Sequence, residues 1–265
     1  MGVKVNLTKR LVATTSVALF AISLSGLATA HASDSRDNNS SHPSASARPT
    51  PTRTSSKVAT PKKMAMPLAA TSADQTVLGC SKTSAVGHYP IKVGTPDTKV
   101  AQVDHTITLN TNCGPITFTA FGKKAPVTVI AMTFLAKAGF FDHSLCHRIT
   151  TSGLFVLQCG DPTATGSGGP MWSYNDENLP ADAPNDYPAG TIAMANSGLQ
   201  NGRGTNGSQF FIVYKDTYLP PSYTIWGQVT SGLDIVKRVA AAGVVGGGTD
   251  GTPVQKIAIE TVSVK

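Results

Sequence analysis

Charged side chains are scarce in this chain, since Asp, Glu, Lys and Arg make up 14% of its 265 residues, and aromatic residues make up only 6%. The net charge of +7 is unevenly distributed. Residues 76–265 hold thirteen Lys or Arg against twelve Asp or Glu, whereas residues 1–75 hold nine against three. A nucleic-acid-binding domain needs a basic patch or a known binding module, and the nearly neutral carboxyl-terminal part shows neither. The sequence therefore predicts no nucleic-acid partner.

Several motifs of enzymes and metal sites are also absent. No G-x-S-x-G elbow surrounds Ser208, so a serine hydrolase is not indicated. The four cysteines contain no C-x-x-C spacing, which argues against zinc. The glycine-rich run 243–251 follows a predicted helix and not a strand, so it does not fit a phosphate-binding loop. Asp176, Glu177 and Asp182 lie among loop-forming residues and indicate a solvated loop rather than a calcium site. We expect neither a metal nor a cofactor.

A long uncharged and partly apolar run spans residues 11–30 and follows three basic residues. Small residues that suit cleavage lie at 28–32, so the layout of residues 1–32 is typical of a secretory signal peptide. An uncleaved membrane anchor is the alternative, because about 20 residues can span a bilayer, although six Ser and Thr make this run a poor span. Either reading places the rest of the chain outside the cytoplasm of a bacterium, secreted or in the cell envelope.

Composition divides the remaining chain into three parts. Residues 33–75 are rich in Ser, Thr, Pro and Ala and nearly lack large apolar side chains, which predicts a disordered linker. Residues 76–104 are irregular and are expected to wrap the edge of a domain. Residues 105–265 carry the periodic patterns and form the domain itself.

Alternating apolar and polar residues predict many short strands in that domain. Two segments have helical spacing instead: one begins at Pro126 and is ended by Gly139, and the other spans residues 233–241. The predicted strands cover residues 105–109, 115–121, 145–149, 155–158, 190–196, 209–214, 224–229 and 257–264. The fold class is therefore mainly β, a closed antiparallel eight-stranded barrel capped by two α-helices.

Four cysteines behind an export signal favour disulfides. Cys146 and Cys159 flank two strands of one predicted hairpin and are expected to face each other across it. Cys80 would then pair with Cys113 by elimination. Four buried free thiols are the alternative.

One strand face combines polar groups with a phenyl ring. Arg148 lies in one strand of the hairpin and Gln158 in the next. Gln209 and Phe211 are two residues apart and so share a face, whereas Phe210 points into the core. An extended peptide needs hydrogen bonds for its backbone and an apolar pocket for its side chain, and this face offers both. A lone arginine in a strand can equally be structural, paired with a carboxylate.

The segments Cys146–Asp161 and Asn206–Val213 resemble the signature segments of the cyclophilins, the peptidyl-prolyl isomerases, and the resemblance extends over residues 105–265. It implies that Arg148 acts on the prolyl amide. It further implies that Phe155, Phe211 and Leu219 line the proline pocket and that Gln158 and Asn196 bind the substrate backbone. The segment Met194–Ser197, with Ala195, resembles the family segment that flanks the residue before the proline.

The chain departs from the family pattern at three places. Four residues, 150–153, replace a tighter Pro-Gly turn. Tyr218 stands where most members have tryptophan, which weakens the expectation of cyclosporin binding, and Tyr223 replaces the usual pocket histidine. With Arg148 retained, the resemblance implies a monomeric, cofactor-free isomerase acting on X-Pro bonds of unfolded or exported polypeptides. A non-catalytic proline-peptide binding module or chaperone on the same fold is the alternative.

Overall fold

A computed structural model of the chain describes residues 79–99 and 102–265. The predicted leader and linker, residues 1–32 and 33–75, lie outside the described residues. The described residues belong to one compact unit, Met64–Lys265. Within them no helix combines the length and the apolar character needed to cross a membrane.

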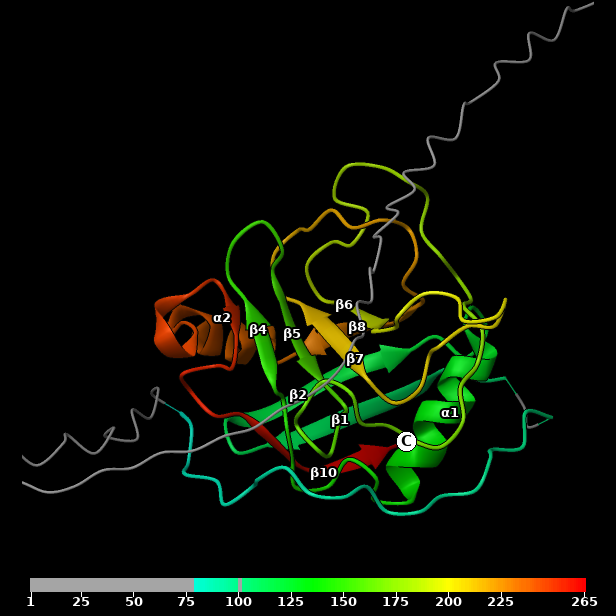
Figure 1. Ribbon diagram of the computed structural model, residues 1–265, viewed down its shortest axis with the longest axis horizontal. Helices are drawn as coiled ribbons and strands as arrows, with labels where there is room; N and C mark the ends of the chain where they lie inside the picture. Colours follow the sequence, from blue (N-terminus) through cyan, green and yellow to red (C-terminus); the bar gives the residue numbers. More distant parts are fainter. Residues whose placement is uncertain (1–78, 100–101) are drawn as a thin grey trace, which may run out of the picture. The chain divides into compact units, whose positions relative to one another are not determined.

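The domain is built on one antiparallel sheet that curls around a core (Figure 1). Its ten strands are, in chain order, β1 His105–Thr111, β2 Gly114–Ala120, β3 Ser144–Leu145, β4 Arg148–Thr150, β5 Val156–Cys159, β6 Thr191–Met194, β7 Phe210–Val213, β8 Ile225–Ser231, β9 Asp250–Gly251 and β10 Ala258–Val264. Neighbours in the sheet follow the order β3-β10-β1-β2-β8-β6-β7-β5-β4-β9. The mainly β class with two helices is confirmed.

The expected eight-stranded closed barrel requires correction. The predicted strand 145–149 is two strands, because the chain changes partners within it: β3 pairs with β10, whereas β4 pairs with β5 and β9. The predicted loop 243–251 contains the extra strand β9 and a short 3-10 helix, Val245–Gly247. The hydrogen-bonded order of the described strands ends at β3 and β9, which do not pair with each other.

The hairpin β1–β2 follows its sequence pattern. Ile107 pairs with Phe118, and Leu109 pairs with Ile116, all of them buried. The turn ends at Gly114, whose φ of +110° suits a residue without a Cβ.

Two helices pack on the sheet, α1 (Pro126–Lys137) beside β10 and α2 (Leu233–Ala241) beside β2. Helix α1 begins at a proline, whose missing N–H costs no helical hydrogen bond there. The backbone N–H groups of Val127 and Thr128 donate to the carboxylate of Glu177 at 3.1 and 3.0 Å. An anionic group at this position also complements the helix dipole. Glu177 therefore anchors the 160–190 loop to the helix.

The core has two parts because the strands alternate. In β7, Phe210 packs edge-on against Trp226 in the main core, with ring centroids 5.9 Å apart. Its neighbour Phe211 faces the opposite way, into a smaller cluster with Val156, Tyr187, Ala193 and Val213. The predicted opposition of these two phenylalanines is thus confirmed, and the smaller cluster forms the floor of the candidate site.

Both expected disulfides are formed, Cys146–Cys159 and Cys80–Cys113. The first joins the chain just before β4 to the end of β5. The second ties the irregular amino-terminal segment to the β1–β2 turn. The described parts of that segment, residues 79–99 and 102–104, contain no helix or strand, and residues 79–99 run along the outside of the domain in Figure 1.

Candidate active site

A cavity of about 210 Å³ opens on the face of the small cluster. Its lining residues are Arg148, Leu154, Val156, Gln158, Ala195, Asn196, Phe211, Leu219 and Tyr223. Strands β4, β5 and β7 are neighbours in the sheet, and their register places Arg148 opposite Gln158 and Gln158 opposite Phe211. Sheet pairing therefore gathers a cation, an amide and a phenyl ring from three separate sequence segments.

The apolar side of the cavity is aromatic. The rings of Phe211 and Tyr223 meet edge to face with centroids 5.6 Å apart, and Tyr187 packs edge-on beneath Tyr223 at 6.3 Å. The Tyr187 hydroxyl donates to the backbone oxygen of Tyr223 at 3.1 Å, which fixes the segment that carries Tyr223. Edge-to-face packing gives this wall a defined shape suited to one small apolar ring.

Arg148 is held by two partners. Its Nε and one terminal nitrogen donate to the two carboxylate oxygens of Asp250, both at 2.7 Å. The other terminal nitrogen donates to Gln158 Oε1 at 3.1 Å. The hydrogen bonds and charge of Asp250 raise the pKa of Arg148, so the guanidinium stays charged, and Arg148 in turn lowers the pKa of Asp250. This forked geometry fixes the plane of the guanidinium.

The amides beside Arg148 form a chain that ends on a glycine-rich loop. Gln158 Nε2 donates to Gln209 Oε1 at 2.9 Å, and Gln209 Nε2 donates to the backbone oxygens of Gly166 and Gly168 at 3.0 and 2.9 Å. The buried carboxylate of Asp161 holds this loop from beneath. Burial alone would raise the pKa of Asp161, but hydrogen bonds from the Thr163 hydroxyl and from backbone N–H groups of the loop lower it.

Asn196 lies at the junction between the cavity and the following loop. Its amide nitrogen donates to Ser222 O at 2.9 Å and to Asp176 Oδ1 at 3.1 Å, while its oxygen accepts from Gly198 N–H at 3.0 Å. Asp176 therefore accepts a hydrogen bond within the protein, contrary to the solvated role expected for it. Within residues 79–99 and 102–265, no group of three or more His, Cys, Asp or Glu is placed to hold a metal ion.

Three of the predicted site residues lie outside the small cavity. Phe155 faces a separate hollow, packs against Tyr214, and lies under the ammonium group of Lys215. Gln209 belongs to an adjoining larger cavity. Tyr218 is 55% exposed and donates its hydroxyl to Asp182 at 3.0 Å.

The position of Phe155 corrects the expectation that it lines the proline pocket. Leu154 and Val156, its neighbours on both sides, line the cavity instead. Side chains alternate along an extended chain, so when the two neighbours face the cavity the residue between them faces away. The longer 150–153 turn precedes this segment, and Leu154 makes a bridge back to Ser152.

Sequence reasoning missed Asp250, the principal partner of Arg148. It lies 102 residues away, in a segment read as a featureless loop. The only signal in the sequence was an isolated acidic residue within the glycine-rich run 243–251. The pairing of β9 with β4 is what brings that residue next to Arg148.

Comparison with known proteins shows the family of the chain. The family model described as cyclophilin type peptidyl-prolyl cis-trans isomerase/CLD matches residues 106–264. The chain belongs to the cyclophilin family. It is 42% identical over 188 residues to a "Probable peptidyl-prolyl cis-trans isomerase B" of Mycobacterium tuberculosis, covering 65% of this chain and 59% of the relative. A protein of the same description from Mycobacterium leprae is 41% identical over 185 residues, covering 65% and 60%.

The chain thus spans about three fifths of the length of these two relatives. A crystal structure of a cyclophilin type isomerase from Cryptosporidium parvum superposes with a TM-score of 0.52 at 24% identity, covering 62% of this chain and 98% of that one. This likeness supports the fold.

His147, next to Arg148, gives a prediction for stability against pH. Neither of its ring nitrogens has a hydrogen-bond partner among the described residues. Burial lowers the pKa of His147 below 6.5, with Asp161 opposing and Arg148 reinforcing the effect. As the pH falls, His147 therefore takes up a proton at a higher pH in the unfolded chain than in the folded chain. The free energy of unfolding should consequently fall as the pH drops below about 6.5.

Urea unfolding of the full chain between pH 8 and pH 5 measures this effect. In His147→Phe, we expect the slope of stability against pH to be shallower by up to about 1.4 kcal/mol per pH unit. His88→Phe is the control. Unlike His147, His88 has a hydrogen-bond partner for a ring nitrogen, since its Nδ1 lies 3.2 Å from the backbone oxygen of Val86. Equal slopes of stability against pH in His147→Phe and in the unmodified chain would show that His147 binds its proton equally well in the folded and the unfolded state.

Proposed function

We propose that this cyclophilin is a peptidyl-prolyl cis-trans isomerase that acts on X-Pro bonds without a cofactor. The observation that carries the proposal is a guanidinium held at the rim of a cavity of about 210 Å³ with an aromatic wall. A proline ring fits such a cavity, and the amide that precedes it then lies beside Arg148.

The chemistry requires only a well-placed donor. Rotation about an X-Pro bond faces a barrier of about 18–20 kcal/mol, because amide resonance is lost when the bond twists. In the twisted state the proline nitrogen regains its lone pair and becomes a better acceptor. A donor aimed at that nitrogen binds the twisted state more tightly than either planar state, which is the requirement for catalysis.

The other lining residues have supporting roles in this proposal. Phe211, Leu219 and Tyr223, with Leu154 and Val156, hold the proline ring. Gln158 both orients Arg148 and offers its amide to the substrate backbone, and Asn196 with Ala195 receives the residue before the proline. Tyr218 is 55% exposed and lies outside the small cavity, and it stands where the resemblance places tryptophan, so we expect weak cyclosporin binding.

Exchange of an Ala-Pro peptide, followed by NMR exchange spectroscopy with the full chain, tests the function. We expect exchange much faster than the uncatalysed process, which takes tens to hundreds of seconds. Shifts of protein resonances with peptide, without faster exchange, would refute the enzyme and leave a proline-peptide binding module.

We further propose that the domain works outside the cytoplasm on newly exported chains. Two disulfides support this, because they persist in oxidising compartments. Detection of the protein in the envelope or medium, with both pairs oxidised, would bear this out, and a purely cytoplasmic location would contradict it.

A further inference from the structure

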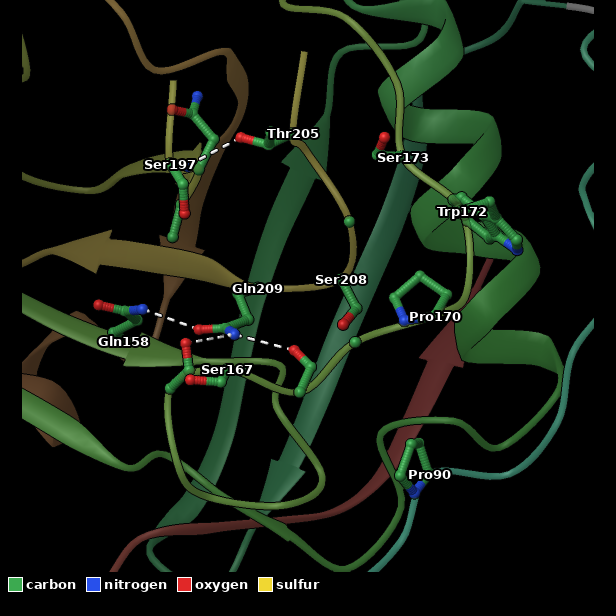
Figure 2. Close-up of a pocket in the computed structure, with 16 residues that line it drawn as sticks. Pro90, Gln158, Ser167, Pro170, Trp172, Ser173, Ser197, Thr205, Ser208 and Gln209 are labelled. Atoms are coloured by element: carbon green, nitrogen blue, oxygen red, sulfur yellow. Dashed lines mark hydrogen bonds between the residues drawn. The ribbon is translucent and has the colours of Figure 1, made fainter. Parts of the chain in front are cut away.

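A second cavity of about 560 Å³ adjoins the proline cavity (Figure 2). The two share Gln158, Ala195 and Asn196, so a chain with proline in the first cavity must pass over these residues to reach the second. One side of the second cavity is the glycine-rich loop that receives Gln209. Pro90 and Trp172 also line it, next to this loop, and Pro90 comes from outside the strands and helices of the domain.

Pro90 belongs to the segment Cys80–Gly94, here called the strap, which is fixed at both ends. At its start, the disulfide Cys80–Cys113 and a 2.7 Å hydrogen bond from Ser81 N–H to Asn112 O join it to the β1–β2 turn. At its end, the indole N–H of Trp172 donates to Gly94 O at 2.9 Å.

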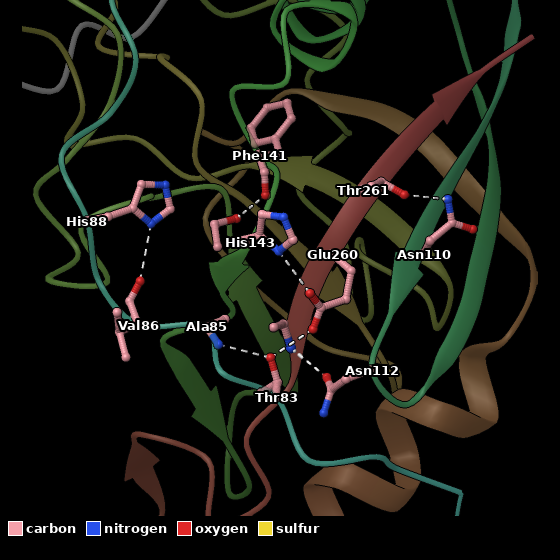
Figure 3. A network of polar contacts seen from close by, with 12 residues as sticks. Thr83, Ala85, Val86, His88, Asn110, Asn112, Phe141, His143, Glu260 and Thr261 are labelled. Atoms are coloured by element: carbon pink, nitrogen blue, oxygen red, sulfur yellow. Dashed lines mark hydrogen bonds and ion pairs between the residues drawn. The ribbon is translucent and has the colours of Figure 1, made fainter.

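Between these ends the strap is held against the domain by side-chain and backbone contacts. Thr83 Oγ1 donates to Glu260 Oε1 at 2.7 Å (Figure 3), and Ala85 is 5% exposed. His88 N–H donates to Pro162 O at 2.9 Å. At Gly87 the strap approaches the glycine-rich loop so closely that an added Cβ would lie 2.3 Å from Thr163 O.

We propose that the strap is a wall of the substrate groove and selects the residues that precede the proline. The inference rests on the proposed isomerase function and goes beyond it, because it assigns specificity to a segment outside the catalytic strands. The rigid anchoring of the strap means that Pro90 presents a fixed surface, which can favour one side chain over another without the cost of ordering a loop.

The lining of the second cavity indicates the kind of side chain that it takes. Its lining is mostly polar or small: glycines, short hydroxyl side chains, Ala195 and the amides of Gln158, Asn196 and Gln209, with Pro90, Pro170 and Trp172 as the larger apolar groups. The hydroxyls of Ser173 and Ser197 make no hydrogen bond to another described residue and can bond a ligand. We therefore expect a preference for short polar side chains such as serine over large apolar ones, which would leave these groups unpaired.

Two matched glycine variants of the full chain test the wall. Gly87→Ala forces the strap and Thr163 apart, whereas Gly94→Ala adds a methyl group that meets no atom of the described residues within 4 Å. The rate constant kcat/KM is measured by NMR exchange for Ala-Pro and for Ser-Ser-Ala-Pro. We expect Gly87→Ala to lower the ratio of kcat/KM for the long peptide to kcat/KM for the short one by about tenfold, which is the scale of one lost hydrogen bond with its packing. Gly94→Ala should leave this ratio unchanged.

Pro90→Trp provides a second, independent variant, since a larger ring fills the cavity without lifting the strap. It should lower the same ratio of kcat/KM values. The control is Ile91→Ala, which changes a neighbour that does not line the cavity and should leave the ratio unchanged. Unchanged ratios in both Gly87→Ala and Pro90→Trp would overturn the proposal, as would equal losses for the two peptides.

Failure of the proposed isomerase function would look different, because the unmodified chain would then exchange neither peptide. In that case NMR titration of the same variants gives the dissociation constants of the two peptides. The ratio of the affinity for the long peptide to that for the short one then tests whether the strap is a wall of the groove.

Discussion

Arg148→Ala should lower kcat/KM for an Ala-Pro peptide by about a hundredfold or more, equivalent to about 3 kcal/mol of barrier. Among the described residues, Arg148 is the only cationic residue that lines the small cavity, and two partners hold its guanidinium in one orientation. We expect most of the loss in kcat and little in KM, because the proline ring is held by apolar groups that the substitution does not touch. NMR exchange spectroscopy over a range of peptide concentrations separates the two.

Arg148→Lys distinguishes charge from geometry. Lysine keeps the cation but cannot bond Asp250 and Gln158 at the same time in a planar fork, so we expect it to recover less than a tenth of the activity. Arg238→Ala is the control, since Arg238 pairs with Asp234 on the surface of α2. A small effect of Arg148→Ala, within about twofold, would show that the arginine is structural, paired with a carboxylate and without a role in rotation.

Asp250→Asn should lower kcat by about tenfold while KM changes by less than twofold. The carboxylate of Asp250 accepts from two guanidinium nitrogens at 2.7 Å each, whereas an amide offers one acceptor oxygen and a nitrogen that repels the second N–H. Arg148 would then keep its charge and lose its fixed plane. The split between kcat and KM marks Asp250 as a positioning residue, since it does not line the cavity.

The matched control is Asp234→Asn, which removes the carboxylate of the Arg238 ion pair and should leave kcat unchanged. Arg148 lowers the pKa of Asp250 below 3.8, so the clamp persists through the neutral range and is lost only as the pH falls below that value. An unaltered kcat in Asp250→Asn would mean that Gln158 alone orients the guanidinium.

Local pattern was sufficient for much of the fold. Hydrophobic periodicity predicted the β1–β2 hairpin and both helices, because these depend on residues near one another in the chain. The opposition of Phe210 and Phe211 followed from strand alternation, which is a property of any extended chain. Two disulfide pairs followed from the position of Cys146 and Cys159 on one hairpin.

The prediction was less accurate where a segment changes its partners. The split of 145–149 into β3 and β4 reflects pairing with β10 on one side and β5 on the other, and no local pattern reports which strands will meet. Phe155 was assigned to the cavity from its place beside Gln158 in the signature segment. Alternation along β5 places Val156 on the same face as Gln158, whereas Phe155, three residues before Gln158, packs against the main core.

By itself, the sequence determined a mainly β domain with a cyclophilin signature and named Arg148, Gln158 and Phe211 as a group, since these residues lie in short, recognisable strands. Only the tertiary structure decided that Asp250 clamps Arg148 and that Pro90 lines the second cavity. The physical reason is the same in both cases. A contact between residues about a hundred apart, or between an irregular segment and a loop, leaves no periodic trace in the sequence and is set by the packing of the whole domain.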